Sequence, residues 1–163
     1  MEIVGRHLRD EALSRSISSE KDLFARSSFN RFYYAAFLRV TRGLAIMSPE
    51  WGGLPHSDIP PLLRGKVTSA LKKLHSQAKR NDDSDLVSKI SFALRAAGEL
   101  ANLLDQGRMT RVAADYRPDQ FVDFSSFEDF SLNMVTVTMA SSWGHKANAH
   151  MQKLERAWRE VIV

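Results

Sequence analysis

The chain has 163 residues, of which 44% are hydrophobic and 26% are charged, the length and composition of one globular domain and not of a disordered tail. It contains no cysteine, which excludes disulfides, thiolate metal sites and thiol nucleophiles and fits a reducing cytoplasm. Residues 1–10 lack the apolar segment of a signal peptide, and no run approaches the roughly 18 apolar residues of a membrane helix, so we expect a single cytoplasmic domain spanning residues 1–163.

Apolar residues recur at spacings of three and four along much of the chain, which is the period of a helix with one buried face. The first such stripe falls in residues 6–17, and a second, rich in aromatic side chains, falls in residues 26–47. Prolines and glycines in residues 48–55 predict a loop. Pro60 and Pro61 then suit the first turn of the next helix, because a proline there loses no hydrogen bond.

This next helix stands out by its charge. Its apolar stripe runs from Val67 to Ala78, and no acidic residue occurs between Ile59 and Asn81. Although the net charge of the chain is only +4, this local density of positive charge indicates either a solvated helix face, which is common for a single helix, or a surface for an anionic partner. The candidate phosphate-binding residues are its basic side chains and three arginines that share a face of the preceding long helix, expected to form one groove: Arg64, Lys66, Lys72, Lys73, Arg80, Arg31, Arg39 and Arg42.

A further helix is expected between an acidic turn and a glycine. Residues 81–85 supply an N-cap and a negatively charged first turn, and apolar residues recur from Leu86 to Leu104. Gly107 is the expected terminator of this helix. Residues 108–123 show little periodicity beyond their first turn, so no long helix is expected there.

The last helix is expected from residue 125 to the C-terminus. Ser125 and Glu128 match a capping box. Residues 134–139 alternate apolar and β-branched side chains, which by itself favours a strand, but a lone strand would have no evident partner in this chain. We therefore expect helix there, bent near residues 141–144. The predicted fold is all-α, an antiparallel bundle of about five helices.

No common enzyme signature is present. The sequence lacks a glycine-rich phosphate loop, a nucleophile elbow and a zinc-protease helix motif. His145 and His150 are five positions apart and do not share a helix face, so we expect neither a metal site nor a cofactor.

Two short strings are the most distinctive parts of the sequence. The first, NRFYYAAF, begins at Asn30. Because its adjacent tyrosines, Tyr33 and Tyr34, cannot both face the core, one of them is expected at the edge of the bundle. The second string, RVAADY, begins at Arg111 and contains Asp115. These two side chains are either an internal ion pair that fixes the loop after the fourth helix or part of an active site.

In this order, the two strings resemble motifs of the HEPN superfamily of helical-bundle proteins, and the helix order is similar over nearly the whole chain. His56 resembles a histidine that is often found in the loop after the long helix of these proteins. The resemblance implies a four- to five-helix bundle that is often a homodimer. It also implies a place in toxin–antitoxin pairs with small nucleotidyltransferases or in antiviral defence, where many members are metal-independent ribonucleases.

The sequence departs from the nuclease pattern of that family, an arginine followed four to six residues later by a histidine, because no arginine here precedes a histidine at that spacing. Where that histidine would stand, the chain has Asp115 and Tyr116, which with Arg111 are the candidate catalytic residues. Arg111 suits a phosphate, but an aspartate paired to an arginine is a weakened base.

The expected function is therefore a HEPN-type module that binds RNA or a nucleotide in a bacterial toxin–antitoxin or antiviral defence system and is catalytically inactive. Two alternatives stay open. One is a protein-interaction bundle that docks a partner such as a nucleotidyltransferase, and the other is a divergent metal-independent ribonuclease.

Overall fold

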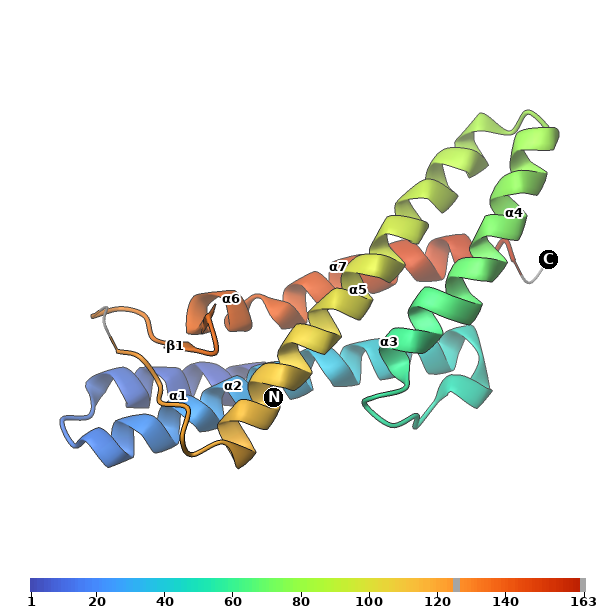
Figure 1. Ribbon diagram of the computed structural model, residues 1–163. Helices are drawn as coiled ribbons and strands as arrows, with labels where there is room; N and C mark the ends of the chain where they lie inside the picture. The colour runs from blue at the N-terminus through green and yellow to red at the C-terminus, as the bar shows by residue number, and fades with distance from the viewer. Residues whose placement is uncertain (125–126, 162–163) are drawn as a thin grey trace. The chain divides into compact units, whose positions relative to one another are not determined.

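The computed structural model, which describes residues 1–124 and 127–161, is mostly helical (Figure 1). Helices account for 77% of it and pack antiparallel, which confirms the predicted all-α class. Strand is limited, in the part of the chain that is described, to one two-stranded hairpin. Among the same residues no helix combines the length and the apolar character that a bilayer-spanning segment needs.

Helices and strands follow one another with short connections. The helices are α1 (Glu2–Ser14), α2 (Ser18–Met47), α3 (Ile59–Leu62), α4 (Thr68–Arg80), α5 (Ser84–Tyr116), α6 (Val137–Ser141) and α7 (Trp143–Trp158), with a 3-10 turn η1 (Pro49–Trp51) and a π-helical turn η2 (Leu63–Val67). The strands are β1 (Ser131–Leu132) and β2 (Val135–Thr136). The predicted helix start at the two prolines is confirmed, and the predicted break near residue 142 separates α6 from α7.

The chain forms two compact units. Unit 1 combines Met1–Phe37 with Gln106–His145, and unit 2 combines Leu38–Asp105 with Lys146–Val163. The long helices α2, α5 and α7 each contribute one segment to both units.

In unit 1, two glycines allow neighbouring helices to pack closely against Phe32 and Tyr33 of the first string. A Cβ atom added at Gly5 of α1 would lie 2.8 Å from the ring of Phe32 on α2, and one added at Gly107 of α5 would lie 2.7 Å from the ring of Tyr33. Tyr33 is fully buried. Gly107 therefore serves close packing of two helices, and the predicted helix end at this glycine is wrong, since α5 continues to Tyr116.

In unit 2, α4 and α5 form an antiparallel hairpin. His75 of α4 hydrogen-bonds to Ser91 of α5 at 3.1 Å, and Arg64, which precedes α4, pairs with Asp105, which is farther along α5. The turn between the helices is capped as predicted, because the Asp83 side chain accepts a hydrogen bond from a backbone N–H in the first turn of α5.

The segment expected as the start of the last helix is instead a hairpin. β1 and β2 pair antiparallel, with Leu132 opposite Val135, and the backbone of Ser131 also exchanges both hydrogen bonds with Asp123. The helix prediction for residues 134–139 is wrong at residues 134–136 and correct from Val137 onward. The missing partner strand lies immediately upstream, across a two-residue turn. The capping-box residue Ser125 lies outside the described residues.

The turn of this hairpin has an unusual sequence. Its two central residues, Asn133 and Met134, have φ angles of 52° and 63°. Positive φ at both positions is the geometry of a type I′ hairpin turn, which favours Asn followed by Gly. Methionine at the second position is sterically unfavourable in this conformation. Because its side chain is 94% exposed, burial does not offset this cost.

Met134→Gly is therefore expected to stabilise the protein by about 1 kcal/mol or less, because glycine adopts this backbone conformation without a clash. Urea unfolding measures the change in the free energy of unfolding. If residues 134–139 were helical instead, the same substitution would destabilise the protein by about 1 kcal/mol, so the sign of the effect distinguishes the two structures.

The two glycines of α5 should respond in opposite ways to alanine. Gly107→Ala is expected to destabilise by about 1–3 kcal/mol, because the new methyl group would overlap the buried Tyr33 ring. Gly98→Ala is the matched control, because no atom lies within 4 Å of its added Cβ, and it should stabilise by up to about 1 kcal/mol. Equal effects in urea unfolding would contradict the close packing of α2 on α5.

Candidate functional site

The two strings singled out in the sequence meet within unit 1. Asn30 of α2 donates a hydrogen bond from Nδ2 to Asp115 Oδ1 at 2.9 Å. Arg111, one turn before Asp115 on α5, places its Nε 2.8 Å from the other carboxylate oxygen. The side chains of Arg111 and Asp115 are only 23% and 24% exposed. The predicted Arg–Asp pair is therefore present, but it lies within the last turns of α5 and not in a loop.

The guanidinium of Arg111 also lies against two aromatic rings. Its central carbon is 5.5 Å from the ring centroid of Tyr116 and 5.9 Å from that of Tyr34. Such contacts favour a cation over each ring face. Of the adjacent tyrosines, Tyr34 is half-buried and Tyr33 is in the core, as the expected split between edge and core requires.

We call this group, which consists of Asn30, Tyr34, Arg111, Asp115 and Tyr116, the Arg111 cluster. Both carboxylate oxygens of Asp115 have partners inside it. One oxygen faces Arg111 and the other accepts from Asn30. The remaining amide oxygen of Asn30 is buried and accepts no hydrogen bond from any described residue. If the Asn30 amide were turned over, its oxygen would face the negatively charged carboxylate of Asp115. The carboxylate therefore fixes the orientation of the amide, although leaving the amide oxygen without a donor costs about 1–3 kcal/mol. The cluster is therefore built to hold α2 and α5 together.

Arg26 is a second buried cation in unit 1, and the sequence pattern does not single it out. Its Nη1 donates to the carbonyl oxygens of Ala113 and Ala114 at 3.1 and 3.3 Å and also to that of Arg117. Its Nη2 donates to the Gln120 carbonyl. A guanidinium that binds the last carbonyls of a helix stabilises the helix end. The one signal in the sequence was an acidic residue four positions earlier.

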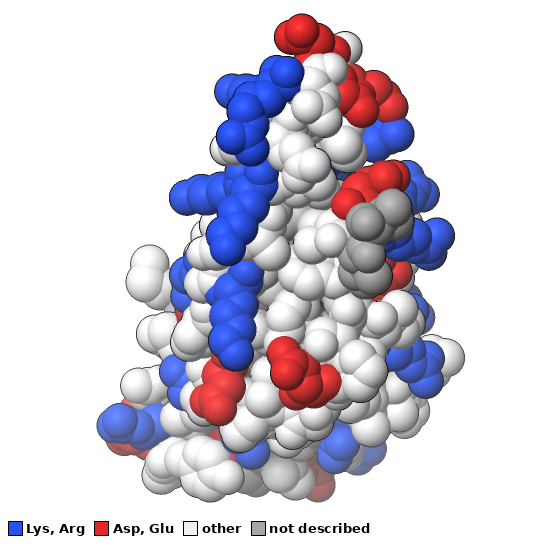
Figure 2. All heavy atoms as spheres, turned by 90° about the vertical axis from the view of Figure 1, so that its right-hand side faces the viewer, with Lys and Arg blue, Asp and Glu red and all other residues white. Residues whose placement is uncertain are grey.

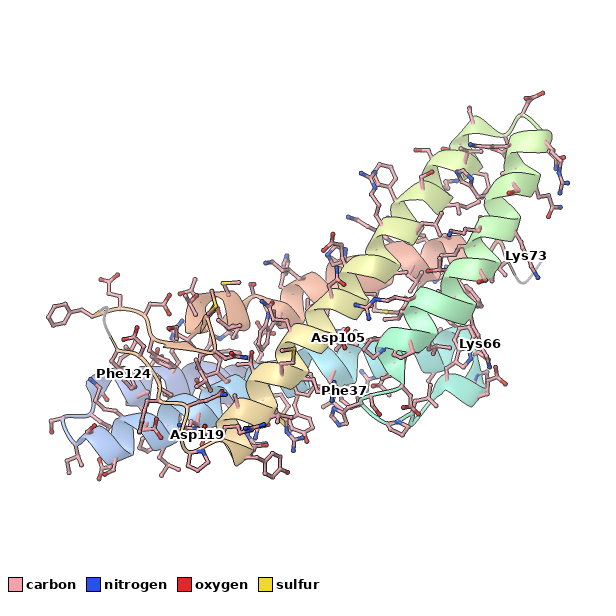
Figure 3. The ribbon with its side chains drawn as sticks, viewed as in Figure 1. Phe37, Lys66, Lys73, Asp105, Asp119 and Phe124 are labelled. Carbon is pink, nitrogen blue, oxygen red and sulfur yellow. The ribbon has the colours of Figure 1, made fainter. Side chains whose placement is uncertain are left out.

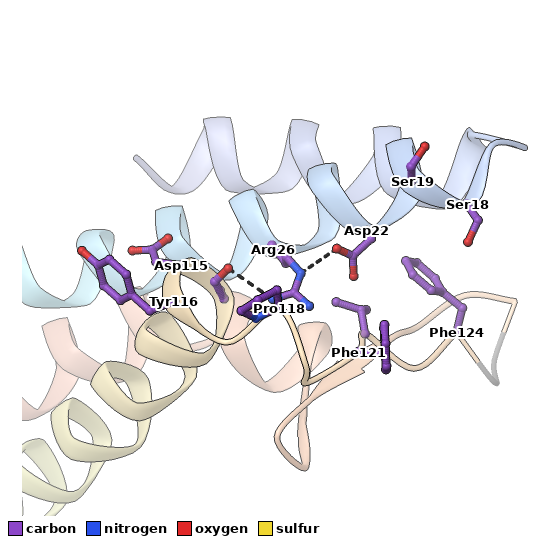
Figure 4. A pocket seen from close by; sticks show the side chains of 11 residues that line it. Ser18, Ser19, Asp22, Arg26, Asp115, Tyr116, Pro118, Phe121 and Phe124 are labelled. Atoms are coloured by element: carbon purple, nitrogen blue, oxygen red, sulfur yellow. Dashed lines mark hydrogen bonds and ion pairs between the residues drawn. The ribbon is translucent and has the colours of Figure 1, made fainter.

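That residue, Asp22, pairs with Arg26 Nε at 2.6 Å and orients the guanidinium (Figure 4). Beside the pair lies an open pocket of about 860 Å³. Its walls include Tyr116, which is 64% exposed, and Phe121, which is 81% exposed. The pocket thus combines an apolar surface with charges that are already paired within unit 1.

The second candidate surface lies in unit 2. Figure 2 shows a column of Lys and Arg side chains on the face that α4 presents, and Figure 3 places Lys66 and Lys73 on the side of the helix that points away from α5. We call this surface the basic face. It consists of five exposed cations: Lys66, Lys72, Lys73, Lys79 and Arg80.

The other predicted phosphate-binding residues do not all join the basic face. Arg64 points to α5, where its guanidinium nitrogens lie 2.7 Å from Asp105 and 2.8 Å from Asn102. Arg31 is half-buried and belongs to unit 1, whereas Arg39 and Arg42 are exposed and belong to unit 2. The groove expected from these arginines is therefore not assembled within one unit.

The histidines give no support for a metal site or for a catalytic role beside Arg111. His56 is half-buried and belongs to unit 2, whereas the Arg111 cluster belongs to unit 1. Burial, with a smaller effect of the nearby Lys153, lowers the pKa of His150. Over the described ranges no three His, Asp or Glu side chains gather in an arrangement that would hold a metal ion.

Comparison with protein-family models, with curated protein sequences and with solved structures finds no match to this chain.

Two ion pairs on α5 have the same spacing and nearly the same length but differ in burial. Arg111→Ala should lower the free energy of unfolding by about 1–3 kcal/mol, because it leaves Asp115 without its cation in a site that is mostly buried. Lys89→Ala removes a 2.7 Å pair with Asp85 whose side chains are 55% and 78% exposed, and because solvent screens this pair the free energy of unfolding should hardly change. Urea unfolding measures both, and equal losses would show that the Arg111 cluster is not structural.

Proposed function

We propose that this protein is a HEPN-type helical module that binds RNA through the basic face of unit 2 and acts in a bacterial toxin–antitoxin or antiviral defence system. One observation carries the proposal. None of the five cations of the basic face has an ion-pair or hydrogen-bond partner among the described residues, and α4 contains no acidic residue. Such a surface attracts a polyanion, because binding releases the counterions of the phosphates.

The spacing of these cations supports a linear ligand. Lys66, Lys73 and Arg80 recur every seven residues, close to two helical turns, so they share one side of the helix and succeed one another at about 10 Å. Elsewhere on the surface, cations such as Arg15 and Lys89 are paired with carboxylates, which raise the pKa of each. The cations of the basic face, by contrast, form a row that no described residue pairs.

The Arg111 cluster supports binding without cleavage. Cleavage of RNA through its own 2′-hydroxyl requires a group that accepts that proton. Asp115 is the candidate, but both of its oxygens are engaged, one by Arg111 and one by Asn30. A divergent ribonuclease remains the competing proposal. Metal-free cleavage that Arg111→Ala abolishes, without loss of the fold, would favour it over the binding module.

A second candidate function rests on unit 1. The pocket beside Arg26 exposes the rings of Tyr116 and Phe121, and large exposed apolar side chains around a pocket are typical of protein-binding surfaces. This observation favours docking of a partner protein, for which the resemblance to HEPN proteins suggests a nucleotidyltransferase or a second copy of the chain.

Replacing Lys72 and Lys73 together by glutamate should abolish binding of a single-stranded RNA and leave the helical circular dichroism spectrum unchanged. Binding by the unmodified protein should weaken steeply with salt, with a log–log slope of about −0.7 for each phosphate neutralised. Fluorescence anisotropy at several salt concentrations measures both effects.

The matched control is Lys146→Glu with Lys153→Glu, which changes the net charge equally on the exposed side of α7. This control should retain most of the RNA affinity. Equal loss in the two double variants would show that net charge, and not the basic face, governs binding. Undetectable binding at low salt would instead favour the protein-docking function.

A further inference from the structure

A second, smaller pocket lies in unit 2 at one end of the basic face. It measures about 440 Å³, is open to solvent and is lined by the segment that joins α2 to α4. We call it the loop pocket. Its lining residues are Glu50, Trp51, Leu54, Asp58, Pro61, Leu62, Gly65 and Lys66.

The base of the loop pocket is apolar and firmly packed. Trp51 and Leu62 are 7% and 9% exposed. The ring of Trp51 stacks edge-on against Trp158 with centroids 5.1 Å apart, and the indole N–H of Trp158 donates to the Met47 carbonyl at 3.0 Å. These contacts fix the apolar side chains beneath the pocket, so little rearrangement is needed when a ligand binds.

Gly65, which lies on the π-helical turn η2, also lines the loop pocket. No atom lies within 4 Å of the position that a Cβ of Gly65 would occupy. The turn, η2, widens the helix at this point, and Thr68 donates its hydroxyl to the Leu63 carbonyl at 2.7 Å. Single π turns inside helices occur often at functional sites. The space beside Gly65 is therefore available to a ligand.

Lys66 connects the loop pocket with the basic face, because it belongs to both. An RNA strand whose phosphates follow Lys66, Lys73 and Arg80 reaches the mouth of the pocket at its end. Its phosphates are disfavoured there, since the negatively charged residues Glu50 and Asp58 also line the pocket. The part of the strand that suits the pocket is a base, which is planar and uncharged.

The two carboxylates indicate which base. They accept hydrogen bonds and donate none, and Asp58 is held by a hydrogen bond from Ser57 at 2.9 Å. Guanine presents two adjacent N–H donors, N1–H and the N2 amino group, which one carboxylate can accept as a pair. Uracil presents a single N–H between two carbonyl oxygens, which a carboxylate repels. From this geometry we infer that the loop pocket binds one guanine of an RNA strand that lies along the basic face, an inference that rests on the proposed function.

Gly65→Leu tests this inference, because the new side chain fills the pocket and leucine favours a helix more than glycine does. The probes are two single-stranded RNAs of equal length, one made only of uridine and one with a single guanine in its centre. The unmodified protein should bind the guanine-containing strand about tenfold more tightly. Gly65→Leu should remove that preference and leave the affinity for the uridine strand unchanged.

Gly98→Leu is the matched control, since Gly98 is also a helical glycine of unit 2 with no atom near its Cβ position. It should keep the preference. Glu50→Gln and Asp58→Asn leave the pocket open, and at least one of them should reduce the preference severalfold, which tests the inference independently of how Gly65→Leu folds.

The outcomes separate this inference from the proposed function. Equal affinity of the unmodified protein for the two RNAs, or a preference that survives Gly65→Leu, would overturn the guanine site while RNA binding by the basic face stands. If neither RNA binds at low salt, the proposed function fails and the guanine site fails with it.

Discussion

The architecture of unit 1 depends on the buried guanidinium of Arg26, whose side chain is only 13% exposed. Its donors bind carbonyls of the last turns of α5 and of the segment that follows, including Ala113 and Gln120. The Ala113 carbonyl also accepts the backbone N–H of Arg117 at 3.2 Å, so the guanidinium adds a second donor where α5 ends and holds the following segment at the same point. Because the end of α5 is fixed against α2, Arg111 and Asp115 come to lie opposite Asn30.

The arginines and lysines of this protein are either buried beside acceptors of the protein or exposed to solvent. This difference in surroundings, more than the residue type, distinguishes a structural cation from one that is free to bind a ligand. Arg26 and Arg111 are mostly buried and face acceptors supplied by the protein, so removing either leaves buried groups unsatisfied. Lys73 and Arg80 face solvent with no acceptor from the described chain. Only cations of the second kind can exchange counterions for phosphates without first breaking internal contacts.

The sequence predicted the elements whose pattern reflects local geometry and missed those that depend on a distant partner. The stripe in α4 and the cap by Asp83 follow from helix period and helix ends, and both were predicted. Gly107 was taken for a helix end because glycine commonly marks one, whereas its role is set by Tyr33, more than seventy positions away in the chain. The site shows the same division: the basic face was visible as a run of charge, but Arg26 carried no local signal strong enough to single it out.

The residues that carry the resemblance to HEPN proteins have packing roles that account for them without any chemistry. Tyr33 fills the contact between α2 and α5, and the carboxylate of Asp115 joins Arg111 to Asn30 across the same two helices. Because these side chains are committed to packing, the surfaces left accessible to a ligand under the proposed function are the basic face and the loop pocket that shares Lys66 with it.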